Sequence, residues 1–457
     1  MKLLIKNAHI INADSSIEAD ILCKNGLISK IGKNLTVEKA NQTIDASGCY
    51  VFPGGIDPHV HMHLPSHAGF SADDFKSGSK AALLGGTTTL IDFVTPHKGQ
   101  SLLDALEKRK KEASNAVVDY SFHVSPVEWR ETTEQEIKDC IKEGITSFKI
   151  YMAYKKAIGI ENEVISKVMK VVGKSGGLVT AHCELGDEIE ILRDQFAKEG
   201  KVSPKYHPLS RPASLEAEAV EEFIAMGDDA DCPVYVVHVS TKESLTHIHQ
   251  AQQKDQKVFA ETCPQYLLLE DSTYQGDFNE TAPFVMSPPL RKEADQKAIW
   301  NAIATETIQT IGTDHCPFTL AQKEFGKDDF RKIPNGAGGV EHRLALLYTF
   351  GVLQNKISLN QFVNSTSTQA AKIFGLYPKK GVIQVGSDAD LVIWNPKKEH
   401  IISTKTHQMN CDSDIYEGIQ TIGEAKYVVT NGKVVVKKGE LIEKDLIGSF
   451  LQRCKIE

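Results

Sequence analysis

The sequence contains two histidines at a spacing that metal sites use. His59 and His61 follow an apolar run that ends at Gly54-Gly55. In an extended strand, residues i and i+2 point to the same face, so both imidazoles can reach one point. Imidazole nitrogens are common protein ligands of zinc. A polar loop with two solvated histidines has the same spacing, so the pair indicates a metal only if further ligands lie in equivalent places.

Further candidate ligands interrupt or close later apolar runs of the sequence. They are Lys149, His182, His238 and Asp314. At the carboxyl end of a parallel strand, such side chains face the active-site end of a barrel. Taken singly, each has an ordinary structural role, as a packed core histidine, a lysine that reaches solvent or an aspartate that caps a helix. Together with the first pair they favour one catalytic metal site.

The elements that would position these residues alternate between strands and helices. Eight apolar, β-branched runs predict strands at 50–56, 87–93, 117–124, 146–151, 178–183, 234–239, 258–262 and 308–312. Helical patterns lie between them and after the last one, including 73–84, 102–113, 134–143, 163–172, 214–226, 244–254, 293–304 and 340–353. Such alternation predicts parallel β/α units and an α/β fold. Eight units predict a (β/α)8 TIM-type barrel; the alternative is an open doubly wound sheet, although no GxGxxG motif opens its first helix.

Both ends of the chain predict short strands. Residues 1–50 contain strand-like runs around an Asn25-Gly26 turn, and residues 388–436 contain a strand and a hairpin that turns at Asn431-Gly432. We therefore predict one small β-sandwich domain from 1–50 and 376–457, with the barrel of 51–375 inserted between its halves.

Composition narrows the class of protein. The 457 residues include 60 acidic and 52 basic side chains, a net charge of −8, which gives no sign of nucleic-acid binding. Nine cysteines without CxxC spacing predict reduced thiols in a cytoplasmic protein. The first residues lack a signal-peptide pattern and no apolar run has membrane-spanning length, so we expect no membrane association.

The motifs that carry these residues resemble those of the cyclic amidohydrolases. The similarity is greatest to the dihydropyrimidinase and D-hydantoinase branch and extends over essentially the whole chain. It rests on the segments GIDPHVH (55–61), FKIYMAY (148–154), AHCE (181–184), VHVS (237–240), GTDHCPF (312–318), ETCPQY (261–266), SPPLR (287–291), IPNG (333–336) and GVIQVGSDAD (381–390).

This resemblance implies a two-zinc centre. His59 and His61 would hold the more buried zinc together with Asp314, and His182 and His238 would hold the other. Lys149 would bridge both ions as a carboxylated lysine. A lysine ammonium beside two dications would be strongly repelled, which favours the modified form. Two metal ions can hold a hydroxide and polarise a carbonyl, and hydrolysis of a cyclic amide needs both.

The resemblance also implies roles in the reaction. Asp314 would accept the proton of the hydroxide and pass it to the leaving ring nitrogen, and Tyr154 would stabilise the oxyanion. Ser287 and Asn335 would bind the imide edge of the ring, largely through backbone groups. The expected reaction opens dihydropyrimidines or 5-substituted hydantoins to N-carbamoyl amino acids. The family is usually oligomeric, so we expect a homo-oligomer, commonly a tetramer.

Three other functions stay open. Dihydroorotase must bind a free carboxylate, and that family typically has an arginine where His63 stands, which disfavours it. Allantoinase shares the chemistry, although Tyr154 and the segment 287–291 fit a hydantoinase better. A non-catalytic, oligomeric scaffold relative has lost metal ligands, whereas all six ligand positions are filled here. His63 also differs from the acidic or amide residue expected in hydantoinases.

The remaining histidines carry no predicted function. Most are expected at the surface or on helices: His9, His67, His97, His123, His207, His247, His249, His342, His400 and His407. His315 is expected to orient Asp314 or its surroundings. Cys316 is expected to pack in the interior near the mouth of the site.

Overall fold

A parallel barrel forms the centre of the molecule. The structure, a computed structural model, describes residues 1–36, 40–443 and 445–455. Eight parallel strands lie in the order β15-β14-β13-β12-β11-β10-β9-β6. Their bounds are β6 (Gly55–Val60), β9 (Thr87–Val94), β10 (Asp119–Val124), β11 (Ser147–Tyr151), β12 (Leu178–His182), β13 (Val234–Val236), β14 (Val258–Thr262) and β15 (Thr310–Ile311). A parallel bridge between Val60 and His315 joins the first strand to the segment after the last, so the predicted barrel is confirmed.

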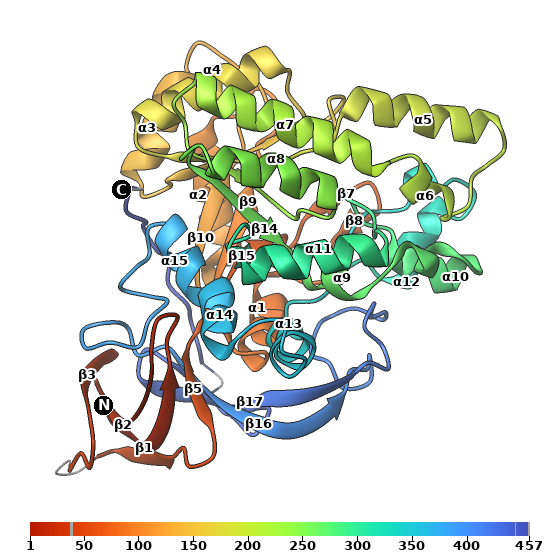
Figure 1. The fold of residues 1–457 in the computed structure, drawn as a ribbon. Helices are drawn as coiled ribbons and strands as arrows, with labels where there is room; N and C mark the ends of the chain where they lie inside the picture. Colours follow the sequence, from red (N-terminus) through yellow and green to blue (C-terminus); the bar gives the residue numbers. More distant parts are fainter. Residues whose placement is uncertain (37–39, 444, 456–457) are drawn as a thin grey trace.

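Helices cover the outside of the barrel (Figure 1). They include α1 (Phe75–Leu84), α2 (Leu102–Glu112), α3 (Thr133–Lys142), α4 (Asn162–Lys174), α7 (Ala213–Asp229), α8 (Lys242–Gln252) and α11 (Glu293–Ala304). Helix α4 buries Ile165, Val168, Met169 and Val172, the spacing of one helical face. Strand β9 is buried along its whole length, as expected for a parallel strand covered on both faces.

Further helices lie in the loops and after the barrel. They are α5 (Gly186–Lys198), α6 (Tyr206–Leu209), α9 (Pro264–Leu268), α10 (Phe278–Thr281), α12 (Leu320–Lys323), α14 (Leu359–Val363) and α15 (Gln369–Ile373). The helix predicted at 340–353 is α13 (Arg343–Leu347), which continues as a π-helical turn over Tyr348–Val352. None of the described helices is long and apolar enough to cross a membrane.

Both chain ends build one nine-stranded mixed sheet, as predicted. Its strands are β1 (Lys2–Ile11), β2 (Ser16–Lys24), β3 (Leu27–Gly32), β4 (Gln42–Asp45), β5 (Tyr50–Pro53), β16 (Leu391–Ile401), β17 (Gln420–Thr430), β18 (Lys433–Lys437) and β19 (Glu440–Leu441). The two halves meet where β5 pairs antiparallel with β16, with Val51 opposite Ile393. The red and blue strands therefore lie side by side below the barrel in Figure 1.

The run predicted as a single strand at 50–56 is divided between the two sheets. Strand β5 belongs to the end sheet, whereas β6 begins the barrel and continues to Val60. Gly54 stands at the change, and a Cβ there would lie 2.1 Å from Oγ1 of Thr88. The predicted extent of this strand is therefore wrong, and His59 lies inside a barrel strand.

The end of the described chain returns to the barrel. The backbone N–H of Leu451 donates to the carbonyl of Tyr120 at 2.7 Å, and Arg453 donates to Oγ of Ser147 at 2.8 Å. We propose that this segment be counted with the barrel and that the first boundary lie at Gly54. The predicted limits 1–50, 51–375 and 376–457 otherwise stay a prediction.

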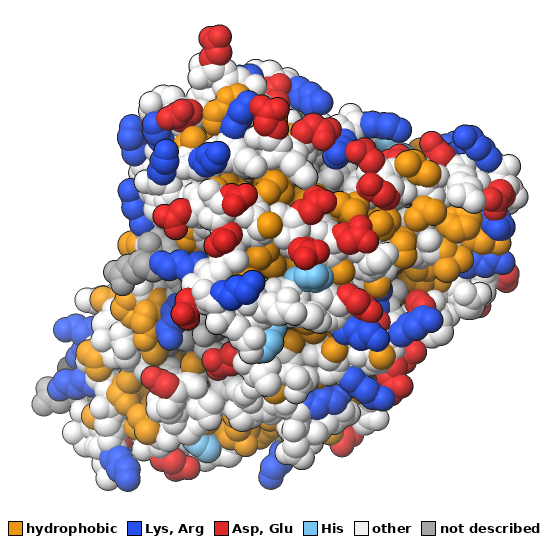
Figure 2. Space-filling view, turned by 45° about the horizontal axis from the view of Figure 1, so that its top comes forward, with side chains coloured by type: hydrophobic (Ala, Val, Ile, Leu, Met, Phe, Trp, Pro, Cys, Tyr) orange, Lys and Arg blue, Asp and Glu red, His pale blue; other side chains and the backbone are white. Residues whose placement is uncertain are grey.

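The distribution of charged side chains on the surface is consistent with the small net charge of the chain. Figure 2 shows acidic and basic side chains interspersed over the face that it presents. Such mixing is typical of a solvated surface.

Candidate metal centre and active site

Three predicted ligands converge where the first and last barrel strands meet. His59 is in β6, His61 directly follows that strand, and Asp314 follows β15. The Nε2 atoms of His59 and His61 are 3.3 Å apart, and Oδ1 of Asp314 lies 3.2 and 3.1 Å from them. Tetrahedral ligands of a zinc ion are themselves separated by about 3.3 Å. The three donor atoms therefore fit one metal ion.

A contact behind the ring of His59 leaves its other nitrogen for a metal. Nδ1 of His59 lies 2.6 Å from the carboxylate of Glu261, so its Nε2 is the free donor. Nδ1 of His61 is buried and has no hydrogen-bond partner among the described residues. The N–H of Asp314 donates to the carbonyl of His59, and that of His61 to the carbonyl of His315, both at 2.9 Å. These backbone bonds fix the side chains relative to one another.

His182 and His238 form a second pair. His182 ends β12 and His238 follows β13. Nδ1 of His182 lies 3.0 Å from Nε2 of His238. Burial lowers the pKa of both imidazoles, so both are neutral, the state that binds metal. The two pairs adjoin, because the ring centroids of His59 and His238 are 5.5 Å apart.

Lys149 is in β11 and is only 1% exposed. Its Nζ lies 5.0 Å from the ring centroid of Phe93 and 5.2 Å from that of Tyr151. Burial lowers the pKa of this amine to about 8, against the opposing effect of the Asp314 and Glu261 carboxylates. The neutral, nucleophilic form of this amine is therefore more populated near neutral pH than that of an ordinary lysine.

A buried ion pair lies behind the second histidine pair. Nε2 of His182 lies 2.7 Å from Glu184, which pairs with Arg211. Burial alone would raise the pKa of Glu184, but the Arg211 guanidinium lowers it to about 2. The guanidinium carbon of Arg211 lies 5.6 Å from the ring centroid of Tyr154. Arg211 thus contacts both the partner of a candidate ligand and a candidate catalytic residue.

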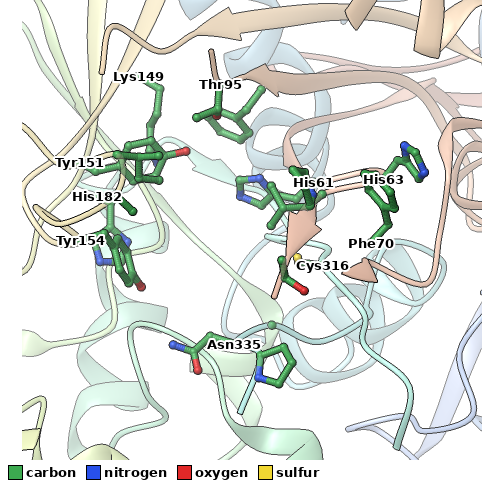
Figure 3. Close-up of a pocket in the computed structure, with 18 of the residues that line it drawn as sticks. His61, His63, Phe70, Thr95, Lys149, Tyr151, Tyr154, His182, Cys316 and Asn335 are labelled. Atoms are coloured by element: carbon green, nitrogen blue, oxygen red, sulfur yellow. The ribbon is translucent and has the colours of Figure 1, made fainter. Parts of the chain in front are cut away.

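Every predicted site residue lines one cavity of about 730 Å³. The set comprises His59, His61, Lys149, Tyr154, His182, His238, Ser287, Asp314 and Asn335. Figure 3 shows Lys149, Tyr154 and His182 on one side of this cavity, His61 at its centre and Asn335 below. The volume suits a small-molecule substrate.

The predicted substrate-contacting residues come from three loops. The carbonyl of Tyr154 accepts the N–H groups of Ala157, Ile158 and Gly159, which fixes the loop after β11. Nδ2 of Asn335 donates to Oγ of Ser287 at 2.8 Å, so the two loops that carry them are in direct contact.

Several non-glycine residues of the site have left-handed backbone conformations. The φ angles are 51° for His63, 61° for Tyr154, 40° for His238 and 52° for Asp314. Such conformations are rare and concentrate at functional sites. His63 stacks on Phe70 at the rim, with ring centroids 3.9 Å apart, and Figure 3 shows this pair beside His61.

Sequence reasoning gave no role to three buried charged residues that support the site: Glu184, Glu261 and Arg211. Two of them carried a usable signal. Glu261 lies inside an apolar strand, and Glu184 follows His182 by two residues. Arg211 lies in a loop and carried none.

The expectation that most of the remaining histidines lie at the surface or on helices does not hold for three of them: His123, His342 and His407 are buried and lie outside the helices. His207 is on helix α6, as that expectation allows, but it is also buried. His207 lies 2.7 Å from the carbonyl of Met286, a distant partner that the sequence does not reveal. Asp414 lies 2.8 Å from His342 and 3.0 Å from His407, separations of direct hydrogen bonds.

The two residues after Asp314 are both buried, which was expected for Cys316. Nε2 of His315 lies 3.1 Å from Asp73, and its Nδ1 accepts the N–H of Gly339 at 3.1 Å. His315 thus orders the surroundings of Asp314. Cys316 packs in the interior and lines the cavity.

Comparisons with known proteins agree with this geometry. A model described as "Amidohydrolase family" matches residues 50–435. A D-hydantoinase of Geobacillus stearothermophilus is 43% identical over 100% of this chain and 97% of its own length. One of Ralstonia pickettii is 40% identical over 100% and 99%. The crystal structure of dihydropyrimidinase from Brevibacillus agri NCHU1002 has a TM-score of 0.98 at 40% identity and covers 100% of both chains.

Proposed function

Because this chain belongs to the amidohydrolase family, in the branch of the hydantoinases and dihydropyrimidinases, and is a hydrolase of cyclic amides, we propose that it opens dihydropyrimidine or 5-substituted hydantoin rings. The product would be an N-carbamoyl amino acid. One observation carries this proposal: two adjoining histidine pairs, with Lys149 and Asp314, line a single cavity.

The family is metal-dependent, and the donor atoms of His59, His61 and Asp314 form one group that could hold a metal ion. We expect two zinc ions per subunit. His59, His61 and Asp314 would hold one ion, and His182 and His238 the other. The separations of 3.1 to 3.3 Å among Nε2 of His59, Nε2 of His61 and Oδ1 of Asp314 support a metal there. When bound, the ions would activate a water and polarise the substrate carbonyl.

Lys149 would hold both ions as a carbamate. A buried ammonium beside two dications is electrostatically unfavourable, whereas a carbamate supplies two anionic oxygens. The low pKa of Lys149 supports this role, because the neutral amine is the form that reacts with CO2.

Asp314 would move the proton. Its contacts with His59 and His61 are both made by Oδ1, which leaves Oδ2 for the reacting groups. Burial would raise the pKa of Asp314, but the neighbouring His59 and His61 lower it, so the group is a carboxylate ready to accept a proton. Asp314 would pass this proton to the ring nitrogen as the cyclic amide bond breaks.

Tyr154, Ser287 and Asn335 would orient the substrate. The Tyr154 hydroxyl would donate to the carbonyl oxygen as negative charge develops there. The side chains of Ser287 and Asn335 are hydrogen-bonded to each other. This supports binding of the imide edge of the substrate by the backbone groups of these two residues.

Oligomeric state and location belong to the same proposal. We expect a homotetramer, measurable by light scattering coupled to size-exclusion chromatography. The cysteines are all free thiols, which supports a reducing, cytoplasmic environment.

The test is a turnover panel of dihydrouracil, hydantoin, allantoin and dihydroorotate with zinc-loaded protein. We expect activity on the first two and about two zinc ions per chain. Dominant activity on allantoin or dihydroorotate would overturn the proposed substrate class. Absence of bound zinc after supplementation would favour a non-catalytic scaffold.

A further inference from the structure

Lys323, the last residue of α12, is a lysine inside the protein. It is only 1% exposed. Its ammonium donates to the carbonyls of Val285 at 3.0 Å, Pro334 at 2.8 Å and Gly336 at 2.8 Å. An ammonium has three N–H donors, and each of them has one acceptor here.

Burial of a lysine ammonium costs free energy unless other groups compensate its charge. Lysine is rarely buried without a charged partner, and these three acceptors are neutral. Burial lowers the pKa of the Lys323 amine to about 7. A methionine would fill a similar volume without desolvating a charge. The three carbonyls therefore explain why a lysine is present.

The carbonyls belong to two segments, 285–287 and 334–336, that are distant in sequence. The N–H of Gly336 also donates to the carbonyl of Val285 at 3.0 Å. Next to these bonds, Asn335 donates to Ser287. The Lys323 contacts thus lie on both sides of Asn335 and two residues before Ser287, the two cavity-lining residues that are candidate substrate contacts.

The first segment has a second anchor, because His207 donates to the carbonyl of Met286 at 2.7 Å. The segment 334–336 contributes two of the three Lys323 acceptors. Loss of the ammonium would leave the carbonyls of Pro334 and Gly336 without this donor, whereas that of Val285 would keep the N–H of Gly336. A buried carbonyl without a partner is strongly unfavourable. We expect the segment 334–336 to move most.

We propose that Lys323 is a positioning residue that holds the segments 285–287 and 334–336 together and thereby sets the affinity of the site for substrate. The inference rests on the proposed function for the roles of Ser287 and Asn335. The contacts of Lys323 do not depend on it.

The test compares Lys323→Met with Lys327→Met, a matched change at an exposed lysine four residues further on. We expect KM of Lys323→Met to rise roughly tenfold, with kcat within about twofold of wild type. Zinc content should be unchanged, and amide hydrogen exchange should accelerate in 285–287 and 334–336 alone. Lys327→Met should match wild type in all four measurements.

Unchanged KM and unchanged exchange in Lys323→Met would overturn the proposal. Faster exchange throughout the barrel strands with loss of zinc would also overturn it, because Lys323 would then support the whole fold. Lys323→Gln, which keeps two N–H donors, should give an intermediate KM; if neither variant folds, the proposed role is wrong. If wild type turns over nothing in the panel, the proposed function fails, while hydrogen exchange still tests Lys323.

Discussion

Nδ1 of His59 lies 2.6 Å from Oε1 of Glu261, and both side chains are fully enclosed. The other oxygen of Glu261 accepts the hydroxyl of Tyr235 at 2.8 Å. A carboxylate in this place fixes the orientation of an imidazole and makes its second nitrogen a stronger ligand. Glu261, behind the ring, thus determines that Nε2 is the nitrogen of His59 that points to Asp314.

Glu261→Gln should weaken zinc binding by about 10–100-fold, because the amide keeps the size of the side chain but removes its charge. Competition with a chelator measures the affinity. Glu293→Gln, on the exposed face of α11, is the control and should bind zinc as wild type does. Equal affinity in both variants would show that Glu261 does not act on the metal.

Lys149→Ala should lose both zinc and turnover, because the proposed bridge between the two histidine pairs is gone. If the bridge is a carboxylate, acetate or propionate should restore part of the activity, and methylamine should not. Carbon-13 NMR of wild type in labelled bicarbonate should show a carbamate signal that the variant lacks. Rescue by the amine instead would contradict the carboxylated form.

Asp314→Asn should lower kcat by roughly 10²–10⁴-fold, the usual contribution of a positioned acid or base. Zinc content, measured by atomic emission, should stay nearly intact because the histidines and the amide oxygen remain. Turnover near the wild-type rate would show that another group moves the proton.

Tyr154→Phe should lower kcat by about 10²–10³-fold while zinc content stays unchanged. The variant keeps the ring, whose centroid is 5.2 Å from that of His182, and loses only the hydroxyl. Tyr427→Phe, in strand β17 of the end sheet, is the control. A matching loss in both variants would mean that the effect is not specific to the oxyanion.

The stability of the protein should depend on pH through His407. Its Nδ1 lies 3.0 Å from Asp414 and its Nε2 lies 3.0 Å from the carbonyl of Cys411. Both partners accept, so the ring satisfies them as an imidazolium. Burial opposes this charge, but Asp414 and the Cys411 carbonyl raise the pKa of His407. Burial also opposes the charge of Asp414, but hydrogen bonds from His342 and His407 lower the pKa of Asp414.

Because the pKa of His407 is raised in the folded protein, its charge contributes stability that is fully present below the ordinary pKa of 6.5. This contribution is lost as pH rises through the raised pKa. Because the pKa of Asp414 is lowered in the folded protein, its charge contributes stability that is present above the ordinary pKa of 3.8. This contribution is lost as pH falls through the lowered pKa. The difference in melting temperature between wild type and His407→Gln should therefore be largest between pH 3.8 and 6.5. Thermal unfolding followed by circular dichroism measures it, and a difference that grows at alkaline pH would contradict the assignment.

The barrel and the residues of its cavity were predictable because their signals are local. Each apolar run marks a strand, and a polar residue at its end marks the mouth of the barrel, as at His182 and His238. The predicted ligands therefore meet in one cavity although no contact between them can be read from the sequence.

Features that depend on distant partners were not predictable. The division of the run 50–56 at Gly54 follows from the close approach of Thr88, which belongs to another strand. Burial of His207 depends on the carbonyl of Met286, and burial of Lys323 on three carbonyls of other loops. Hydrophobic periodicity carries no information about such pairings.

The return of Arg453 to the barrel has a consequence for biosynthesis. Its guanidinium donates to Ser147, the first residue of the strand that carries Lys149, across a separation of 306 residues. During translation the ribosome completes every barrel strand before it makes this arginine. The barrel strand that carries Lys149 therefore acquires this hydrogen bond only after residue 453 has been made, later than any strand of the barrel itself.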